Sequence, residues 1–319
     1  MKGGLSYSYP VEFALSLGPL PELEPVAKYS AGLRSRVVGG EKTLEEFRFA
    51  LQALAQESNF LDFFNTWRSR YDQWISSVSA GLDFIKVTNY LSGFFGWDCG
   101  GFHVVLAPAM FSAGYGPTIY GKDGAATAYN VICGSASATL DPVFPSAGAD
   151  LEKLSLHEIG HSSVNPTMED FKDRVGACEP LFNKVESQMV DKAYPNVYIF
   201  MNEQVLRGMV ALATRDLYGE AAFESEVNAN EGFYLTRFMA EQMADYAANR
   251  AKYPKLTDFV PMLLDRIDEG PVRDALRAQA RATGFGAGAA VVAAAAIILL
   301  VYRRRAAKRT TPGHKPSSS

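Results

Sequence analysis

Two histidines and a glutamate near the middle of the chain have the types and spacing of a metal site. His157, Glu158 and His161 form the pattern His-Glu-x-x-His. Histidines four residues apart on a helix share one face, so their imidazole nitrogens can bind one metal ion. Zinc lowers the pKa of a bound water to roughly 7, and the intervening glutamate can take the proton of that water. The pattern predicts a Zn2+ site with Glu158 as general base.

A third metal ligand is required, and histidine is a poor source for it. Besides the pair in the motif, the chain has only His103 and His314. His103 lies in a strand-like run and is expected to be structural, and His314 follows the long apolar segment near the C-terminus. A carboxylate on a later helix is therefore expected, and Glu203 is the best candidate. It stands in an otherwise apolar helical stretch, where a charge must be exposed, paired or metal-bound.

Arg207, one helical turn after Glu203, could hold or neutralise that carboxylate as a second-shell residue. The alternative is an ordinary surface pair between Glu203 and Arg207. Three other carboxylates stay open as the third ligand: Glu231, Glu179 and Glu186.

Attack on a carbonyl also creates an oxyanion, which needs a hydrogen-bond donor besides the metal. Tyr234 and Tyr218 are candidates, because both follow Glu203 along the chain. A packing role is the alternative for each.

The elements that must position these residues can be read from the periodicity of apolar residues. Helical spacing covers the region from 43 to 95, and the residues of this region expected in the core are Phe63, Trp67, Tyr71, Trp74 and Ile75. Strand-like runs at 102–106, 118–120 and 126–133 predict a small antiparallel sheet, with a turn at 121–124. Helical patterns return from 150 to 282, and Asn165-Pro166 is expected to end the motif helix.

The predicted fold class is α+β, mostly helical, with one domain over residues 1–283. Residues 284–302 contain no charge and span roughly 28 Å as a helix, so they predict a C-terminal transmembrane helix. Residues 303–319 are basic and are expected to form a disordered cytoplasmic tail. A single-pass membrane protein with an extracytoplasmic body is expected. The first residues make a poor export signal, so either the true start lies upstream, which the basic flank favours, or the protein is tail-anchored with its body in the cytoplasm.

Charge and cysteine content narrow the function classes. Six basic residues fall in 303–319, which leaves 25 basic against 35 acidic residues in 1–302. An acidic body is a poor partner for phosphate backbones, so nucleic-acid binding is not expected. Three cysteines are too few for a disulfide scaffold, although Cys99 and Cys133 could pair.

The motif residues carry a resemblance to known families. His157-Glu158-x-x-His161 with a downstream Asn-Glu203 helix resembles the gluzincin class of zinc metallopeptidases. His-Glu-x-x-His-Ser-x-Val-Asn-Pro at 157–166, followed by Asn-Glu-x-x-x-Arg at 202–207, more closely resembles a bacterial domain family of unknown function thought to be zincin-like. Pro-Val-Glu-Phe at 10–13 is similar to the start of that domain.

This resemblance implies a zincin-like fold with an active-site helix, a metal-ligand helix behind it and a sheet whose edge strand borders the cleft. In that geometry residues 126–133 would form the edge strand, to which an extended peptide substrate could add. The expected function is a membrane-anchored zinc-dependent hydrolase, a peptidase, with the bilayer as a second partner through 284–302. The alternative is a catalytically inactive zincin-like protein with a peptide-binding or structural role at the membrane.

Overall fold

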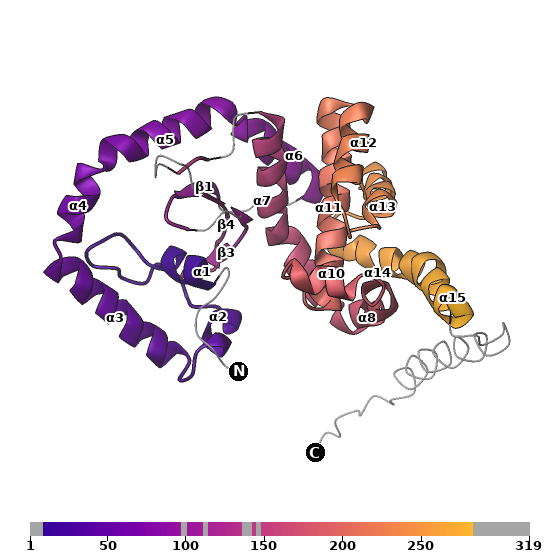
Figure 1. The fold of residues 1–319 in the computed structure, drawn as a ribbon, viewed down its shortest axis with the longest axis horizontal. Helices are drawn as coiled ribbons and strands as arrows, with labels where there is room; N and C mark the ends of the chain where they lie inside the picture. Colours follow the sequence, from indigo (N-terminus) through magenta and orange to yellow (C-terminus); the bar gives the residue numbers. More distant parts are fainter. Residues whose placement is uncertain (1–8, 97–100, 111–113, 136–141, 145–147, 283–319) are drawn as a thin grey trace, which may run out of the picture. The chain divides into compact units, whose positions relative to one another are not determined.

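The computed structural model describes residues 9–96, 101–110, 114–135, 142–144 and 148–282 (Figure 1). The strands are β1 (Gly101–Ala107), β2 (Gly114–Tyr115), β3 (Thr118–Tyr120) and β4 (Ala126–Cys133). The helices before the sheet are α1 (Tyr9–Leu15), α2 (Ala31–Arg36), α3 (Glu41–Glu57), α4 (Phe60–Thr66), α5 (Arg68–Gly81) and α6 (Phe84–Phe95). The helices after it are α7 (Ala149–Glu169), α8 (Lys172–Gly176), α9 (Glu179–Phe182), α10 (Glu186–Asp191), α11 (Val197–Tyr218), α12 (Glu220–Ala229), α13 (Thr236–Ala248), α14 (Leu256–Ile267), the π-helical turn η1 (Asp268–Val272) and α15 (Arg273–Ala282).

The chain divides into two compact units where sequence analysis places one domain. The first unit contains the residues up to Asp170 together with Asn202–Phe259. The second contains Phe171–Met201 and the described residues from Val260 onward. Both histidines of the motif, Glu158 and Glu203 belong to the first unit.

The sheet of the first unit is built around β4. Strand β1 runs parallel to β4, with Gly101 opposite Thr127. Strands β2 and β3 run antiparallel to β4 on its other side. The expected turn between β3 and β4 is confirmed, because Gly121 N–H donates to the Ala125 carbonyl over 2.9 Å.

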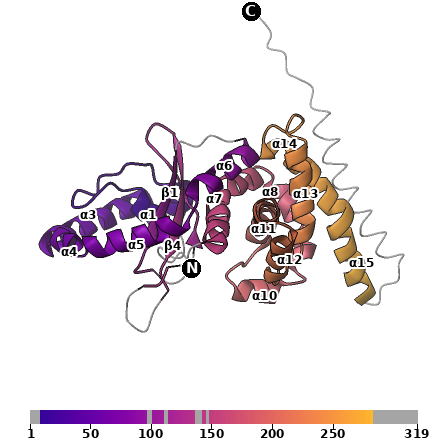
Figure 2. The same cartoon turned by 90° about the horizontal axis from the view of Figure 1, so that it is seen from above.

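The two faces of β4 are covered by different helices. Asn130 and Ile132 point toward α7, where Ile132 packs in a cluster with Leu151 and the Asn130 amide donates to the Ser155 hydroxyl over 2.8 Å. Val131 faces the other way and packs with Val11 of α1. Figures 1 and 2 both show α7 alongside β4. The motif helix is therefore seated directly on the sheet.

The predicted fold class is corrected in two respects. The sheet is mixed rather than antiparallel, because β4 inserts between β1 and the β2–β3 segment, and its buried apolar residues favour the central position. Within the described ranges, no helix combines the length and the apolarity needed to cross a bilayer. The segments 284–302 and 303–319, on which the transmembrane and tail predictions rested, lie outside the described residues, as does Cys99.

The predicted end of the motif helix is also wrong. Helix α7 continues through Pro166 to Glu169. Proline removes one intrahelical hydrogen bond. Burial of Val164, Thr167 and Met168 on either side of that position compensates for this loss.

Several large apolar residues between 60 and 81 are more exposed than their spacing suggests. Phe63, Trp67 and Ile75 are 52%, 45% and 53% exposed, whereas Tyr71 and Trp74 are half-buried, and α4 has no buried residue. Figure 1 shows α3, α4 and α5 following one another around the outside of the sheet. Helical spacing shows which residues share a face, but it does not show that another element covers that face.

In the second unit, an arginine connects α8 to α14 and an aromatic pair connects α9 to the start of α11. Arg174 of α8 donates to the Asp265 carboxylate over 2.8 Å and to the Pro261 carbonyl over 3.0 Å, both on α14. Phe182 and Phe200 pack edge to face with ring centroids 5.8 Å apart.

Helix α11 lies against α13 at a glycine. A Cβ atom on Gly208 would come within 2.3 Å of the Met239 Cβ and within 2.9 Å of the Ala240 backbone nitrogen. Backbone atoms cannot move aside as a side-chain terminus can. Gly208 therefore sets the distance between α13 and the helix that carries Glu203.

We expect Gly208→Ala to destabilise the protein by about 2 kcal/mol or more, because overpacking a filled contact forces the two helices apart. Gly93→Ala is the matched control, since a Cβ there meets nothing within 4 Å and should stabilise α6 by about 0.5–1 kcal/mol. Urea unfolding of both variants measures the two effects. Equal stability of the two variants would contradict this account.

Candidate metal centre

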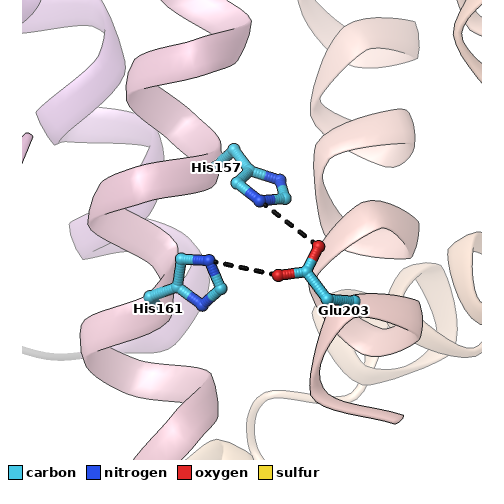
Figure 3. A group of neighbouring side chains, drawn as sticks. All are labelled: His157, His161 and Glu203. Atoms are coloured by element: carbon cyan, nitrogen blue, oxygen red, sulfur yellow. Dashed lines mark ion pairs between the residues drawn. The ribbon is translucent and has the colours of Figure 1, made fainter. Parts of the chain in front are cut away.

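The two motif histidines lie on one face of α7, one turn apart (Figure 3). Their ring centroids are 5.0 Å apart and the ring planes are nearly perpendicular, at 89°. Their side chains are mostly buried, with 16% and 17% exposed. Both imidazoles point toward the same place, as the spacing predicts.

Glu203 on α11 faces this pair from the opposite side (Figure 3). One carboxylate oxygen lies 3.5 Å from the His157 Nε2 atom, and the other lies 3.4 Å from the His161 Nε2 atom. Ligand atoms of all three residues lie within 4.8 Å of one another. Among the described residues this is the one cluster of at least three His, Cys, Asp or Glu side chains close enough to hold a metal ion.

A glycine inside the motif allows α11 to come this close. A Cβ atom on Gly160 would lie 2.6 Å from the Leu206 Cδ1 atom and 2.8 Å from the Met209 Cε atom. Both of those α11 residues are fully buried. The helices therefore meet at Gly160, between the two turns that present the histidines and the glutamate.

The protonation states suit a metal ligand set. Burial lowers the pKa of His157 to about 3, so its imidazole is neutral at pH 7. Burial alone would raise the pKa of Glu203, but His157, His161 and Arg207 together lower it. Glu203 is therefore ionised. A neutral imidazole and a carboxylate are the forms that bind zinc.

Asn165, one turn after His161, orients the second imidazole. The His161 Nδ1 atom lies 3.1 Å from the Asn165 Oδ1 atom. An amide oxygen only accepts hydrogen bonds, so in the tautomer with a proton on Nδ1 the ring would donate to Asn165 and leave Nε2 facing Glu203. Such outer contacts fix the tautomer of a metal-binding histidine. Asn165 belongs to the quoted motif, but its role was missed because it was read only as a helix terminator.

Arg207 binds the Glu203 carboxylate, as predicted. Its Nε and Nη2 atoms lie 3.1 Å and 3.0 Å from the same glutamate oxygen. Glu203 is only 5% exposed, so the alternative of a surface ion pair does not describe this contact.

Glu158 is buried beside the candidate ligands His157, His161 and Glu203. It is 6% exposed, and within the described part of the chain nothing donates a hydrogen bond to its carboxylate. Burial raises its pKa to about 7. A Cβ atom on Gly114 would lie 2.4 Å from a Glu158 carboxylate oxygen, and one on Gly116 would lie 1.8 Å from the Glu158 backbone oxygen. The β2 segment therefore passes directly over this glutamate.

The two tyrosine candidates lie in different places. Tyr218 comes fifteen residues after Glu203 on α11, about 22 Å along the helix axis. Its hydroxyl donates to Glu152, which also pairs with Lys86. Tyr234 is 42% exposed and stands between two residues that contact α11 around Glu203. The Phe233 ring lies under the Arg207 guanidinium, and the Leu235 N–H donates to Gln204.

The remaining candidates do not join the cluster. Glu231, Glu179 and Glu186 are all exposed, and the three-ligand group does not contain them. His103 is exposed on β1 and stacks on Tyr129 of β4, with centroids 5.3 Å apart. This contact fits the expected structural role.

The donor set fits a tetrahedral zinc ion. Two ligand atoms that are each about 2.1 Å from a tetrahedral zinc ion lie about 3.4 Å apart. The separations of 3.5 Å for His157 and 3.4 Å for His161 are of this size, each to a different oxygen of the Glu203 carboxylate. His157, His161 and Glu203 would therefore be the residues that hold a zinc ion.

Comparison with known proteins agrees with the coarser part of the resemblance. The family described as Domain of unknown function (DUF4932) matches residues 3–265. No curated protein and no solved structure matches the chain. The match includes the motif helix, the Glu203 helix and the sheet between α6 and α7, and the chain belongs to the DUF4932 family, a domain family of unknown function.

Proposed function

We propose that this protein is a zinc-dependent hydrolase that cleaves peptide bonds. One observation carries the proposal: ligand atoms of two imidazoles and one carboxylate converge within 4.8 Å of one another, with each imidazole 3.4–3.5 Å from a carboxylate oxygen. The buried, unpaired Glu158 beside them supports it. A buried carboxylate without a hydrogen-bond partner costs stability, and a role as general base accounts for its presence at this position.

Zinc, when bound, supplies a Lewis acid that acidifies water and polarises a carbonyl. Glu158 accepts the proton of the attacking water as oxygen bonds to the carbonyl carbon. The same carboxyl group then delivers that proton to the leaving amine as the carbon–nitrogen bond breaks. A pKa near 7 suits a group that must both accept and donate a proton at neutral pH.

Tyr234 is the better of the two tyrosines for stabilising the developing oxyanion. The segment that carries it is fixed to α11 on both sides of the residue, by Phe233 and by Leu235. Tyr218 donates its hydroxyl to Glu152 instead. These contacts anchor the backbone on both sides of Tyr234 next to the helix that carries Glu203, which makes its hydroxyl the preferred candidate donor.

The peptide-binding edge differs from the one that the sequence suggested. Strand β4 is paired on both sides, so residues 126–133 cannot accept another strand. The Gly114–Tyr120 segment lies on the outer side of β4 and next to Glu158. We place an extended substrate along that segment, with its scissile bond near the general base.

The first test is zinc stoichiometry. The full chain, purified without chelator, should carry about one equivalent of zinc, and Glu203→Ala and His157→Ala should each lose most of it. Glu179→Ala is the matched control, because Glu179 is an exposed carboxylate outside the cluster. Elemental analysis measures the metal. A Glu203→Ala variant that retains full zinc would remove Glu203 from the site.

The second test concerns the general base. Glu158→Gln should keep zinc and lower the cleavage rate of a peptide library by at least about 100-fold, because the side chain can no longer take a proton. Glu169→Gln, at the exposed end of the same helix, should behave as the parent does. A Glu158→Gln variant that retains full activity overturns the mechanism, and a parent that binds zinc but cleaves nothing supports the inactive alternative.

The third test uses stability without metal. The pKa of Glu158 rises from 4.5 to about 7 on folding, so the folded protein binds more protons than the unfolded chain between these values. The parent should lose stability across pH 4.5–7, by at most about 3 kcal/mol, and the Glu158→Gln variant should not. The difference in unfolding free energy, measured with chelator, should therefore grow to pH 7 and then level off. A constant difference would show that Glu158 is not buried as described.

A further inference from the structure

Asn230 lies behind the metal ligands and contacts the arginine that binds Glu203. The Arg207 Nη1 atom donates to the Asn230 Oδ1 atom over 2.6 Å. The opposite edge of this guanidinium, with the Nε and Nη2 atoms, contacts the Glu203 carboxylate. The Asn230 side chain is therefore one hydrogen bond away from the group that holds the third ligand.

The amide of Asn230 is itself held in a fixed orientation. Its Nδ2 atom donates to the Glu226 backbone oxygen over 2.7 Å and to the Glu226 carboxylate over 3.3 Å. These donor contacts leave the amide oxygen facing Arg207. Asn230 is 8% exposed, so little water competes for either end of the amide.

The network returns to the motif helix. The Glu226 carboxylate lies 3.2 Å from the Lys153 ammonium on α7, four residues before His157. The chain of contacts runs from Lys153 through Glu226, Asn230 and Arg207 to Glu203, which faces the α7 histidines. Through α12, this chain of contacts links the helix that carries the histidines to the helix that carries Glu203. Glu203 is its one member that belongs to the proposed ligand set.

We propose that Asn230 is a positioning residue for the metal centre: it holds Arg207 so that the Glu203 carboxylate faces His157 and His161. This inference rests on the proposed zinc site and adds to it a residue that the sequence motif does not contain. Residues behind metal ligands orient those ligands, and their loss typically costs 10- to 100-fold in metal affinity.

The chain provides a matched control. Asn249 ends α13 as Asn230 ends α12, and its Nδ2 atom donates to the Asp245 backbone oxygen over 2.8 Å and to the Asp245 carboxylate over 2.7 Å. Asn249 is exposed and makes no contact with Arg207 in the described structure. The two alanine variants therefore lose the same local helix-end contacts, and only one loses the link to Glu203.

The experiment measures zinc affinity of the metal-free full chain by competition with a coloured chelator. Asn230→Ala should bind zinc about 10- to 100-fold more weakly than the parent, and Asn249→Ala should bind as the parent does. Melting in the presence of chelator shows whether each variant is folded. If Asn230→Ala does not fold, Asn230→Ser is measured in its place. Its shorter side chain can still donate to the Glu226 backbone oxygen but does not reach Arg207, so it should also bind zinc about 10- to 100-fold more weakly, and parent-like affinity would count against the proposal.

A double-mutant cycle separates positioning from general damage. If Asn230 acts through Arg207, adding Asn230→Ala to Arg207→Met should change zinc affinity little further. Additive losses in the cycle, or parent-like affinity of Asn230→Ala alone, overturn this inference while the zinc site stands. A parent that binds no zinc overturns both.

Discussion

The approach of α7 to α11 beside Gly160 is the constraint on which the candidate metal centre depends. A β-carbon at that position would meet the buried side-chain ends of Leu206 and Met209, and the Glu203 carboxylate lies 3.4–3.5 Å from the histidines of the neighbouring helix. Gly208 allows a similarly tight approach of α13 to the same helix. Helix α11 therefore lies close to α7 and to α13 at two glycines, Gly160 and Gly208. A larger residue at either glycine is expected to shift α11 and with it the Glu203 carboxylate.

Two buried carboxylates in this region differ in how their charge is compensated. Glu203 is stabilised in its ionised form by two histidines and Arg207, and its pKa falls. Glu158 is next to His157 in the sequence, and burial is the main influence on its pKa, which rises to about 7. When the surroundings of two neighbouring acids shift their pKa values in opposite directions, the two acids are suited to different chemical roles. Glu203 is suited to binding a cation and Glu158 to exchanging a proton.

The sequence was most informative where chemistry and periodicity coincide. His157, His161 and Glu203 could be chosen because few residue types bind zinc and a charge in an apolar helix needs a partner. Strand β4, which contains Asn130, shows the opposite case. The local pattern predicts a strand there, but it does not predict that this strand lies between the others, because strand order depends on which strand buries the most apolar surface. Asn230 could not be found from the sequence, since its role depends on a contact with Arg207 twenty-three residues away.

The outer segment of the sheet, Gly114–Tyr120, offers little regular edge with which a further strand could pair. Its two strands contain only two and three residues and are separated by Gly116 and Pro117. Proline has no amide hydrogen to offer, and short interrupted edges are poor templates for further pairing. The apolar strand beside them, β4, is therefore covered on this side and is not open to pairing with another chain. If a peptide substrate binds there as proposed, it would form only a few main-chain hydrogen bonds, so side-chain contacts would supply most of the selectivity.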